Sequence, residues 1–441
     1  MRTLSVVVSG ISLIAAGGLF AQGPELPLPD AIKIALDNNR PAKILQLDIT
    51  KAEWAVASTK TKRLPSFNTY FFGSAMLTSP TWNFPANTFQ TSDNQPVPAT
   101  DTKINYSHGF TGLVTAEAAQ PLSQLYKIGL AIQEQELEVS LSRQKYEAKR
   151  QSVVADVKQA YYAILQSESA LDAAAATVKQ YQETDRVVLD YVAQRSVLKS
   201  SSLDVKAKLA QAQYQVIQLS NTLQTQKEKL NFLMGRDLDT PFRTQQVPPE
   251  EEREIDLKVA RQTALSQRPE VKEAEIDSQR ADYDRKLATS QYIPDVGAAF
   301  HYTSPFNTSI LPENIASAGV EMRWEPFEWG RRRDEVKQKD VVVEQSKYQL
   351  SEARSQVLLE VDSSFRKLAE SRSLLSVAEA ARDAANEKLR EVNEKFKQSA
   401  VLLRDVLEQQ AAVASAENDY EESLLAFWSA KASFEKALGE E

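Results

Sequence analysis

The sequence contains no cysteine and only two histidines in 441 residues. Without cysteine the chain cannot form disulfide bonds, thiolate zinc sites, iron–sulfur clusters or a catalytic thiol. Two histidines also argue against a histidine-rich metal centre and against a serine triad with a histidine base. Neither His108 nor His301 has a partner carboxylate nearby in sequence, so we expect neither to bind a metal. The composition predicts a protein that has no cofactor and is not an enzyme.

The sequence also has few glycines, and it has fewer basic than acidic residues. There are 13 glycines, whereas an average protein contains roughly 7%, and this predicts few turns and long elements. The 52 basic residues are outnumbered by 60 acidic ones, which gives a formal net charge of −8. Because such a chain has little to balance a phosphate backbone, we expect no nucleic-acid partner.

Long apolar runs are absent beyond the first residues. Residues 1–21 have the features of a signal peptide: Met1-Arg2 is positive, Leu4 to Phe20 is apolar, and Ala21 is a small residue at the expected cleavage point. An uncleaved anchor helix is the alternative. No other stretch approaches the roughly 18 apolar residues that a membrane helix needs. A mature chain that sits in a membrane must therefore do so as a β-barrel.

The same plan of elements occurs twice along the chain. Arg40-Pro41 recurs as Arg268-Pro269, and the glycines Gly235 and Gly439 follow long helical stretches as expected helix C-caps. Each copy has a helix, a proline break and a second helix that a further proline ends. This internal duplication predicts a first repeat over 22–243, a linker over 244–256 and a second repeat over 257–441.

Each repeat is expected to contain three helical segments and two strands. In the first repeat these are helices 30–63, 123–195 and 203–235 with strands 66–77 and 109–119; in the second, helices 257–292, 328–398 and 402–438 with strands 295–304 and 315–324. Polar loops join the strands, over roughly 78–106 and 304–314. The strands of the second repeat alternate between an apolar face and a polar or charged face, as transmembrane barrel strands do, although a soluble hairpin would alternate in the same way.

The helix lengths predict how the helices are arranged. In each repeat the two shorter helices together are about as long as the long one, so they can stack end to end beside it over roughly 100 Å. Heptad spacing in the second long helix indicates coiled-coil packing. Four strands are too few to close a barrel, whose smallest members have about eight, so two or three copies of the chain must contribute.

The chain resembles the TolC-like outer membrane efflux proteins. The resemblance covers essentially the whole mature chain and rests on LPDAIKIALDNNRPAKI, AEWAVASTKTKRLPS, AQPLSQL, EPFEWGRRR and LNFLMGRD, together with the duplicated order of elements. It implies a mainly helical homotrimer with a 12-stranded β-barrel in outer-membrane lipid above a long helical tunnel in the periplasm. It also implies a periplasmic adaptor (membrane fusion protein) and an inner-membrane transporter as partners.

This resemblance predicts the outer-membrane channel-tunnel of a tripartite efflux pump or a type I secretion system in a Gram-negative-type bacterium. Such a protein is a passive conduit that is gated at its periplasmic helical tip. The alternative is a periplasmic adaptor or scaffold built from helical hairpins, which would lack strands that face lipid. Adaptors usually carry a glycine-rich lipoyl-like β-domain, and this sequence has no such segment.

The resemblance also assigns candidate pore residues at the expected periplasmic tip. Asp405 and Glu408 are three residues apart, so they share a helix face, and they match the acidic constriction of the family. In three copies they would form a ring of six carboxylates that favours cations. Phe396 and Ser399 are candidate gate residues, and Asp204 is the counterpart of Asp405 in the first repeat. The alternative is an ordinary solvated helix face.

A group of aromatic and basic residues follows the last strand. Its members are Trp324, Phe327, Trp329, Arg331, Arg332 and Arg333. Aromatic side chains at a barrel rim suit the headgroup region, and arginines suit an anionic leaflet. The sequence therefore predicts a membrane-interface belt here, with a packed strand-to-helix corner as the alternative.

Overall fold

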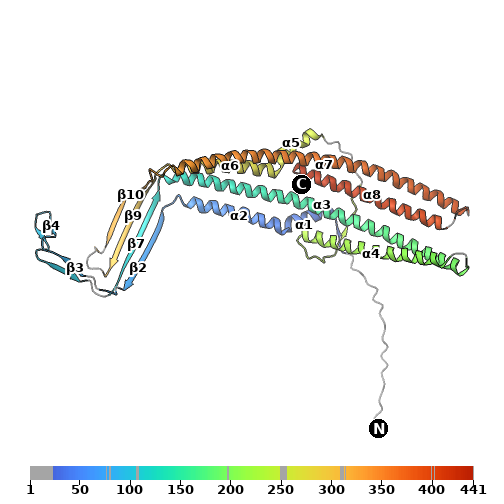
Figure 1. The fold of residues 1–441 in the computed structure, drawn as a ribbon, viewed down its shortest axis with the longest axis horizontal. Coiled ribbons are helices and arrows are strands. Elements are labelled where there is room, and N and C mark those ends of the chain that lie inside the picture. Colours follow the sequence, from blue (N-terminus) through green and yellow to red (C-terminus); the bar gives the residue numbers. More distant parts are fainter. Residues whose placement is uncertain are drawn as a thin grey trace, which may run out of the picture. The chain divides into compact units, whose positions relative to one another are not determined.

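The computed structural model describes residues 23–440 except 76, 79, 80, 106–108, 196, 197, 249–255, 308–311, 313, 399 and 402 (Figure 1). The expected signal peptide, His108 and Ser399 lie outside the described residues. The chain divides into two compact units. Unit 1 comprises Met1–Leu47, Arg143–Glu273 and Ser351–Glu441, and unit 2 comprises Asp48–Ser142 and Ala274–Leu350.

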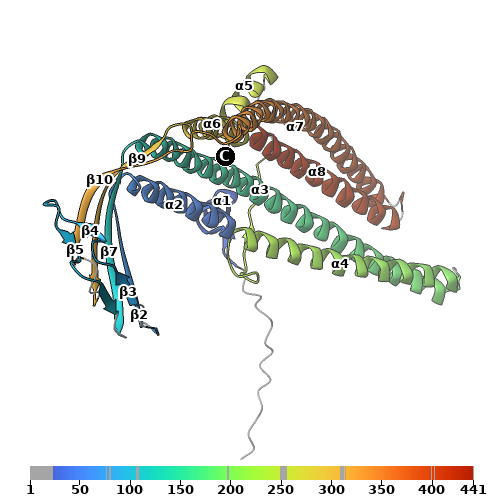
Figure 2. The same ribbon diagram turned by 60° about the vertical axis from the view of Figure 1, so that its left-hand side comes forward.

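Helices make up most of the chain. They are α1 (Leu28–Asn38), α2 (Arg40–Thr61), α3 (Gln124–Ala193), α4 (Lys199–Leu233), α5 (Leu257–Gln267), α6 (Pro269–Ser290), α7 (Arg331–Lys397) and α8 (Leu403–Leu438). In unit 1, α4 runs beside the C-terminal part of α3, and α8 runs beside the C-terminal part of α7 (Figures 1 and 2). None of the helices in the described part of the chain is long and apolar enough to cross a membrane.

The prolines break the helices where the sequence predicts. The α1–α2 joint lies at Asn39 and the α5–α6 joint at Arg268, where ψ is 117° and 124°. Arg268 is extended because the ring of a following proline disfavours the helical conformation. Pro41 is tolerated because it falls in the first turn of α2, where its missing N–H has no helical partner.

Each joint binds the end of the last helix of its own half of the chain. Asn39 donates from Nδ2 to the carbonyl of Leu233 at 2.9 Å, and its Oδ1 accepts from the N–H of Ala42. In the second half, Arg268 donates from a terminal guanidinium nitrogen to the carbonyl of Lys436 at 3.1 Å. The two joints therefore perform the same task with different chemistry, an amide in one and a guanidinium in the other.

Glycine follows both of these helices, as the sequence predicts. Gly235 and Gly439 have φ angles of +69° and +82°, in the left-handed region that favours glycine. A Cβ atom on Gly235 would lie 2.5 Å from the carbonyl oxygen of Asn38. Glycine is thus required here both by the backbone conformation and by the close approach of α1.

Unit 2 contains one four-stranded antiparallel sheet. Its strands are β2 (Ser66–Ala75), β7 (Phe110–Pro121), β9 (Asp295–Phe306) and β10 (Ile315–Arg323), in the order β10-β9-β7-β2. The sheet therefore joins strands from both halves of the chain, and β2 and β10 are its two edges.

The segment expected to be a polar loop contains two small antiparallel strand pairs, and the outer pair encloses the inner one in the chain. One pairs β3 (Thr81–Phe84) with β6 (Thr102–Asn105), and the other pairs β4 (Phe89–Gln90) with β5 (Pro96–Val97). Asn87 and Asn94 have positive φ angles in these turns, a conformation that asparagine tolerates well. The prolines and polar residues that indicate a loop therefore also suit short hairpins with tight turns.

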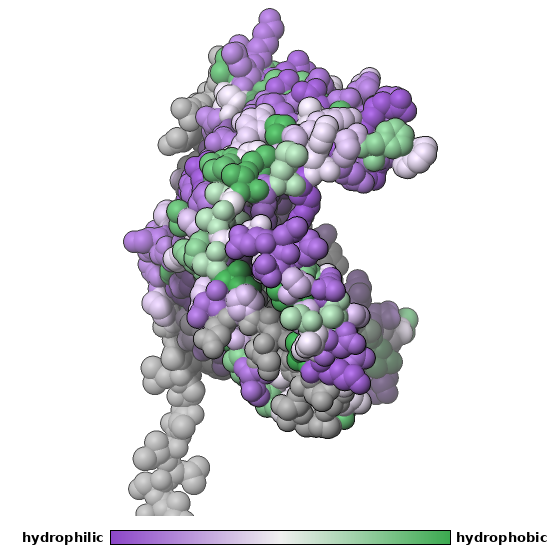
Figure 3. Space-filling view, turned by 90° about the vertical axis from the view of Figure 1, so that its left-hand side faces the viewer, coloured by the Kyte–Doolittle hydropathy of each residue, from purple (hydrophilic) through white to green (hydrophobic). Residues whose placement is uncertain are grey.

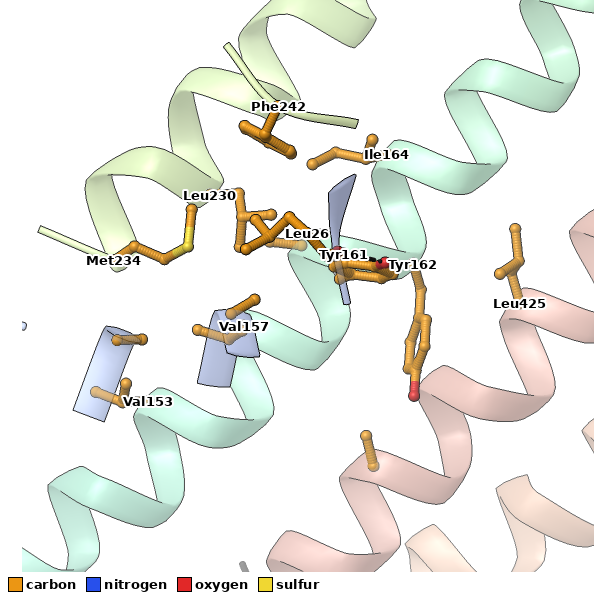
Figure 4. Close-up of a cluster of buried hydrophobic side chains, with 14 residues drawn as sticks. Leu26, Val153, Val157, Tyr161, Tyr162, Ile164, Leu230, Met234, Phe242 and Leu425 are labelled. Atoms are coloured by element: carbon orange, nitrogen blue, oxygen red, sulfur yellow. Dashed lines mark hydrogen bonds between the residues drawn. The ribbon is translucent and has the colours of Figure 1, made fainter. Parts of the chain in front are cut away.

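The main hydrophobic core lies in unit 1 around α3. Val153, Val157, Tyr161 and Ile164 are fully buried there, against residues of α4 and α8 (Figure 4). The hydroxyl of Tyr161 donates to the carbonyl of Leu26 at 2.9 Å. This bond anchors a short parallel pair, β1 (Glu25–Leu26) with β8 (Arg243–Thr244), to the core.

Unit 2 holds its helices together with a smaller core and with ion pairs. Ala52, Val56 and Val139 are its buried apolar cluster. Three ion pairs at 3.0 Å each link helices of this unit: Lys60 of α2 with Glu136 of α3, Arg280 of α6 with Glu138 of α3, and Lys339 of α7 with Asp284 of α6. Small buried residues let the helices approach closely, and the longer charged side chains connect them at the surface.

Candidate functional site

The acidic pair predicted for the pore lies at the start of α8. Asp405 is in the first turn, and Glu408 follows about one turn later. Asp405 is half-buried and Glu408 is exposed. Carboxylates in the first turn of a helix are favoured by the helix dipole, so the position of Asp405 suits a negatively charged side chain. The two carboxylates share one side of the helix, as their spacing predicts.

The end of α7 precedes this pair. Phe396, in its last turn, is 40% exposed. The chain leaves the helix through a turn in which the N–H of Ala400 donates to the carbonyl of Lys395 at 2.9 Å. Lys397 pairs with Glu394 at 2.7 Å, and this hydrogen bond lowers the pKa of Glu394. Glu394 therefore stays ionised near the tip.

The corresponding turn between α3 and α4 is built differently. Arg195, shortly after the end of α3, has a φ of +54° and turns the chain. Asp204 is exposed and lies in the second turn of α4, whereas its counterpart Asp405 lies in the first turn of α8. The two acidic residues therefore occupy different depths in their helices.

The three aromatic residues of the predicted belt are all exposed at the β10–α7 corner. The exposed fractions of Trp324, Phe327 and Trp329 are 54%, 67% and 89%. The rings of Phe327 and Trp329 pack edge to face, with their centroids 4.8 Å apart. Trp329 and Gly330 both have positive φ angles, and a tryptophan in that region is strained. The corner thus holds a large aromatic ring out toward its surroundings.

The arginines of the belt have carboxylate partners. Arg332 is 12% exposed and pairs with Glu328 at 3.0 Å, and Arg331 pairs with Glu328 at 2.9 Å and with Glu335 at 2.9 Å. Arg333 is 69% exposed and pairs with its neighbour Asp334. The run of three arginines is therefore largely neutralised locally, and it stabilises the corner as well as lying at the surface.

The sheet has one apolar face, as the alternation predicts. Ala318, Val320 and Met322 of β10 lie opposite Phe300, Ala298 and Val296 of β9. The same face includes Phe67 and Phe71 of β2, which are 78% and 61% exposed. Hydrophobic residues reach the surface on the side of the molecule that carries the strands (Figure 3). The face suits an apolar environment.

The other face contains a contact that sequence analysis missed. The Nε2 atom of His301 lies 3.0 Å from Oε1 of Glu321, and Glu117 of β7 is the direct cross-strand partner of His301. All three residues are distant in sequence, and only the strand register brings them together. No group of three or more metal-ligating side chains has the geometry of a metal site within the described residues.

The comparison with family models identifies one family. A family model described as outer membrane efflux protein matches residues 31–236 and 260–440. The fold is similar to that of the Campylobacter jejuni CmeC outer membrane channel, with a TM-score of 0.76 and 16% identity over 93% of this chain and 85% of that one. No curated protein matches the sequence significantly.

Two further solved structures have the same fold. The Neisseria gonorrhoeae MtrE outer membrane channel in its open state has a TM-score of 0.70 and 15% identity, over 94% of this chain and 89% of that one. The outer membrane protein VceC from Vibrio cholerae has a TM-score of 0.69 and 16% identity, over 94% of this chain and 96% of that one. The mainly helical fold predicted from the sequence is confirmed.

Proposed function

Because the chain belongs to the outer membrane efflux protein family, we propose that it is the channel-tunnel of a tripartite efflux pump or a type I secretion system. It is an outer-membrane channel protein with a helical periplasmic part. Its family and fold are those of channel proteins and not of enzymes. In our proposal it is a passive conduit from the periplasm to the exterior.

The sheet of unit 2 is the observation that supports this proposal most directly. One face is apolar and exposed, and the other carries the charged side chains, which suits a wall between lipid and water. The outer edges of β2 and β10 have no partner strand among the described residues. Pairing β10 of one copy with β2 of the next would satisfy both edges. Three copies would then give a closed barrel of twelve strands, the trimer that the family resemblance implies.

The tip of α7 and α8 is the proposed gate. Three copies of Asp405 and Glu408 would place six carboxylates around the axis, where they would favour cations. Phe396 would narrow the same opening, and Ser399 and Asp204 belong to the same tip region. A periplasmic adaptor would bind the helical end, and an inner-membrane transporter would supply the energy. The members of the predicted belt would lie at the membrane interface: Trp324, Phe327, Trp329, Arg331, Arg332 and Arg333.

The sheet also argues against the alternative of a periplasmic scaffold. A broad exposed apolar face is unfavourable on a scaffold surrounded by water, because a large apolar patch on a soluble protein promotes aggregation. No observation on the described residues favours that second function.

The conductance of the detergent-extracted protein in a planar lipid bilayer tests the proposal. We expect discrete steps that favour K⁺ over Cl⁻, and a weaker preference in Asp405→Asn/Glu408→Gln. The control Glu391→Gln removes an exposed carboxylate of α7 and should leave the preference unchanged. Silence from both the wild type and the double variant would refute the channel. Unchanged selectivity in a conducting double variant would refute the proposed ring.

A further inference from the structure

The acidic, basic and imidazole side chains of the four-stranded sheet all lie on one face. They are Glu117, Asp295, His301, Glu321 and Arg323. The register pairs Glu117 with His301 and Asp295 with Arg323, and residues separated by an even number along one strand share a face. Five such residues on one face, with none on the other, indicate that the two faces meet different surroundings.

Three of these residues form a compact layer. His301 and Glu321 meet at 3.0 Å although they are not direct cross-strand partners. They reach each other over Gly297, Ala299 and Gly319, which have little or no side chain. A Cβ atom on Gly319 would have no heavy atom within 4 Å. The open space at Gly319 therefore lets the imidazole and the carboxylate reach each other.

The negative charge of the face is concentrated in this layer. Asp295, nearer the helices, is paired with Lys127 at 2.6 Å and lies opposite Arg323. By contrast, the layer of Glu117, His301 and Glu321 has two carboxylates for one imidazole. The side chains of His301 and Glu321 are 42% and 62% exposed, so their charges act on the space in front of the sheet.

We propose that Glu117, His301 and Glu321 form a second selectivity layer, inside the barrel, that favours cations and weakens in acid. This inference rests on the proposed function, because the layer lines a lumen only if copies of the sheet close into a barrel. The apolar face would then be turned to lipid, and the charged face to the lumen. The layer is separate from the proposed carboxylate ring of the periplasmic tip.

The size of the effect follows from Coulomb's law. At a separation of about 10 Å in water, one carboxylate changes the local concentration of a monovalent cation by about twofold. Three copies would contribute six carboxylates. Imidazole is the side chain that changes its charge between about pH 5 and 8. The charged groups that face His301 are Glu117 from β7 and Glu321 from β10, so a proton on its ring offsets half of their charge.

The experiment measures reversal potentials of the full-length protein in planar bilayers under a KCl gradient. The variants are Glu117→Gln/Glu321→Gln and His301→Gln, and the control Ser317→Ala changes the residue opposite His301 without changing charge. Each is also made in the Asp405→Asn/Glu408→Gln background, so that selectivity at the tip cannot mask the layer. The wild type and each variant are measured at about pH 7.5 and about pH 5.5.

We expect the double glutamine variant to lose at least about twofold in its K⁺ over Cl⁻ preference, and Ser317→Ala to retain it. Acidification should weaken the preference of the wild type but not that of His301→Gln. If Glu117→Gln/Glu321→Gln forms conducting pores with the same K⁺ over Cl⁻ preference as its parent, the inference is overturned and the proposed function is left intact. Silence from both the wild type and the Asp405→Asn/Glu408→Gln background would refute the proposed function itself.

Discussion

Replacing Arg268 with methionine tests whether the α5–α6 joint stabilises the end of α8. Arg268 is only 5% exposed and has three sets of partners: Glu270 and Glu360 at 2.8 Å each, and the carbonyl of Lys436 at 3.1 Å. Burial alone would lower its pKa, but its hydrogen bonds to the two carboxylates and their charges raise the pKa overall. Methionine keeps most of the side-chain volume and removes every donor.

The expected loss follows from these partners. The carbonyl of Lys436 also accepts from the N–H of Gly439 at 3.0 Å, so methionine removes one of its two hydrogen bonds. Losing a bond from a charged donor costs about 1.5–3 kcal/mol. The two carboxylates are 46% and 40% exposed, so water screens them and each ion pair adds less than about 1 kcal/mol. A total of about 2–4 kcal/mol of local stability would raise the exchange rate of nearby amides by about 30- to 900-fold.

Hydrogen exchange of the detergent-solubilised protein, followed by mass spectrometry, measures this change in exchange rate over residues 434–439. The control is Arg261→Met, because Arg261 also binds α7 with two hydrogen bonds, to Asp362, but is 44% exposed. We expect that control to change the exchange only slightly, since exposed pairs contribute little. Equal effects from the two variants would refute the claim that burial makes the joint important.

Two other changes test the helix end and a half-buried acid. Gly235→Ala should lower the thermal unfolding midpoint, because it places a Cβ atom at positive φ and 2.5 Å from the carbonyl oxygen of Asn38. The control Gly129→Ala, inside α3, should stabilise the protein by about 0.5–1 kcal/mol. An unchanged midpoint in Gly235→Ala would contradict the steric argument. Burial raises the pKa of Glu421 above its ordinary 4.5; the charge of Glu417 acts in the same direction and that of Arg382 opposes it. The folded state therefore binds the proton more tightly than the unfolded state, so stability falls as the pH rises from 4.5 through the raised pKa. Glu421→Gln should therefore stabilise the protein at neutral pH and lose that advantage at low pH, and a pH-independent gain in unfolding midpoint would count against this assignment.

The features that could be predicted from the sequence are those that local residues determine. Proline-free stretches predict long helices, Pro41 and Pro269 predict the joints, and Gly235 predicts a left-handed C-cap. The alternation of β9 and β10 predicts the two faces of the sheet, which the register confirms. Each of these depends on residues close together in the chain, where backbone sterics and side-chain period act directly.

Features that depend on distant residues could not be predicted. The contact between His301 and Glu321 needs the pairing of β9 with β10 and the small residues between them. Glu328 and Arg332 are only four residues apart, but their ion pair spans the positive φ angles of Trp329 and Gly330, so helical spacing alone does not predict it. The site assignments at Asp405, Glu408, Phe396, Ser399 and Asp204 remain predictions.

The strengths of the two joints respond differently to changes in salt concentration. The amide of Asn39 carries no net charge, so its bond to Leu233 is insensitive to ionic strength. The guanidinium of Arg268 depends partly on two carboxylates that are open to water, and dissolved ions shorten the reach of such charges to about 8–10 Å under ordinary conditions. One half of the chain thus has a joint that tolerates salt, and the other has a joint whose strength varies with the medium.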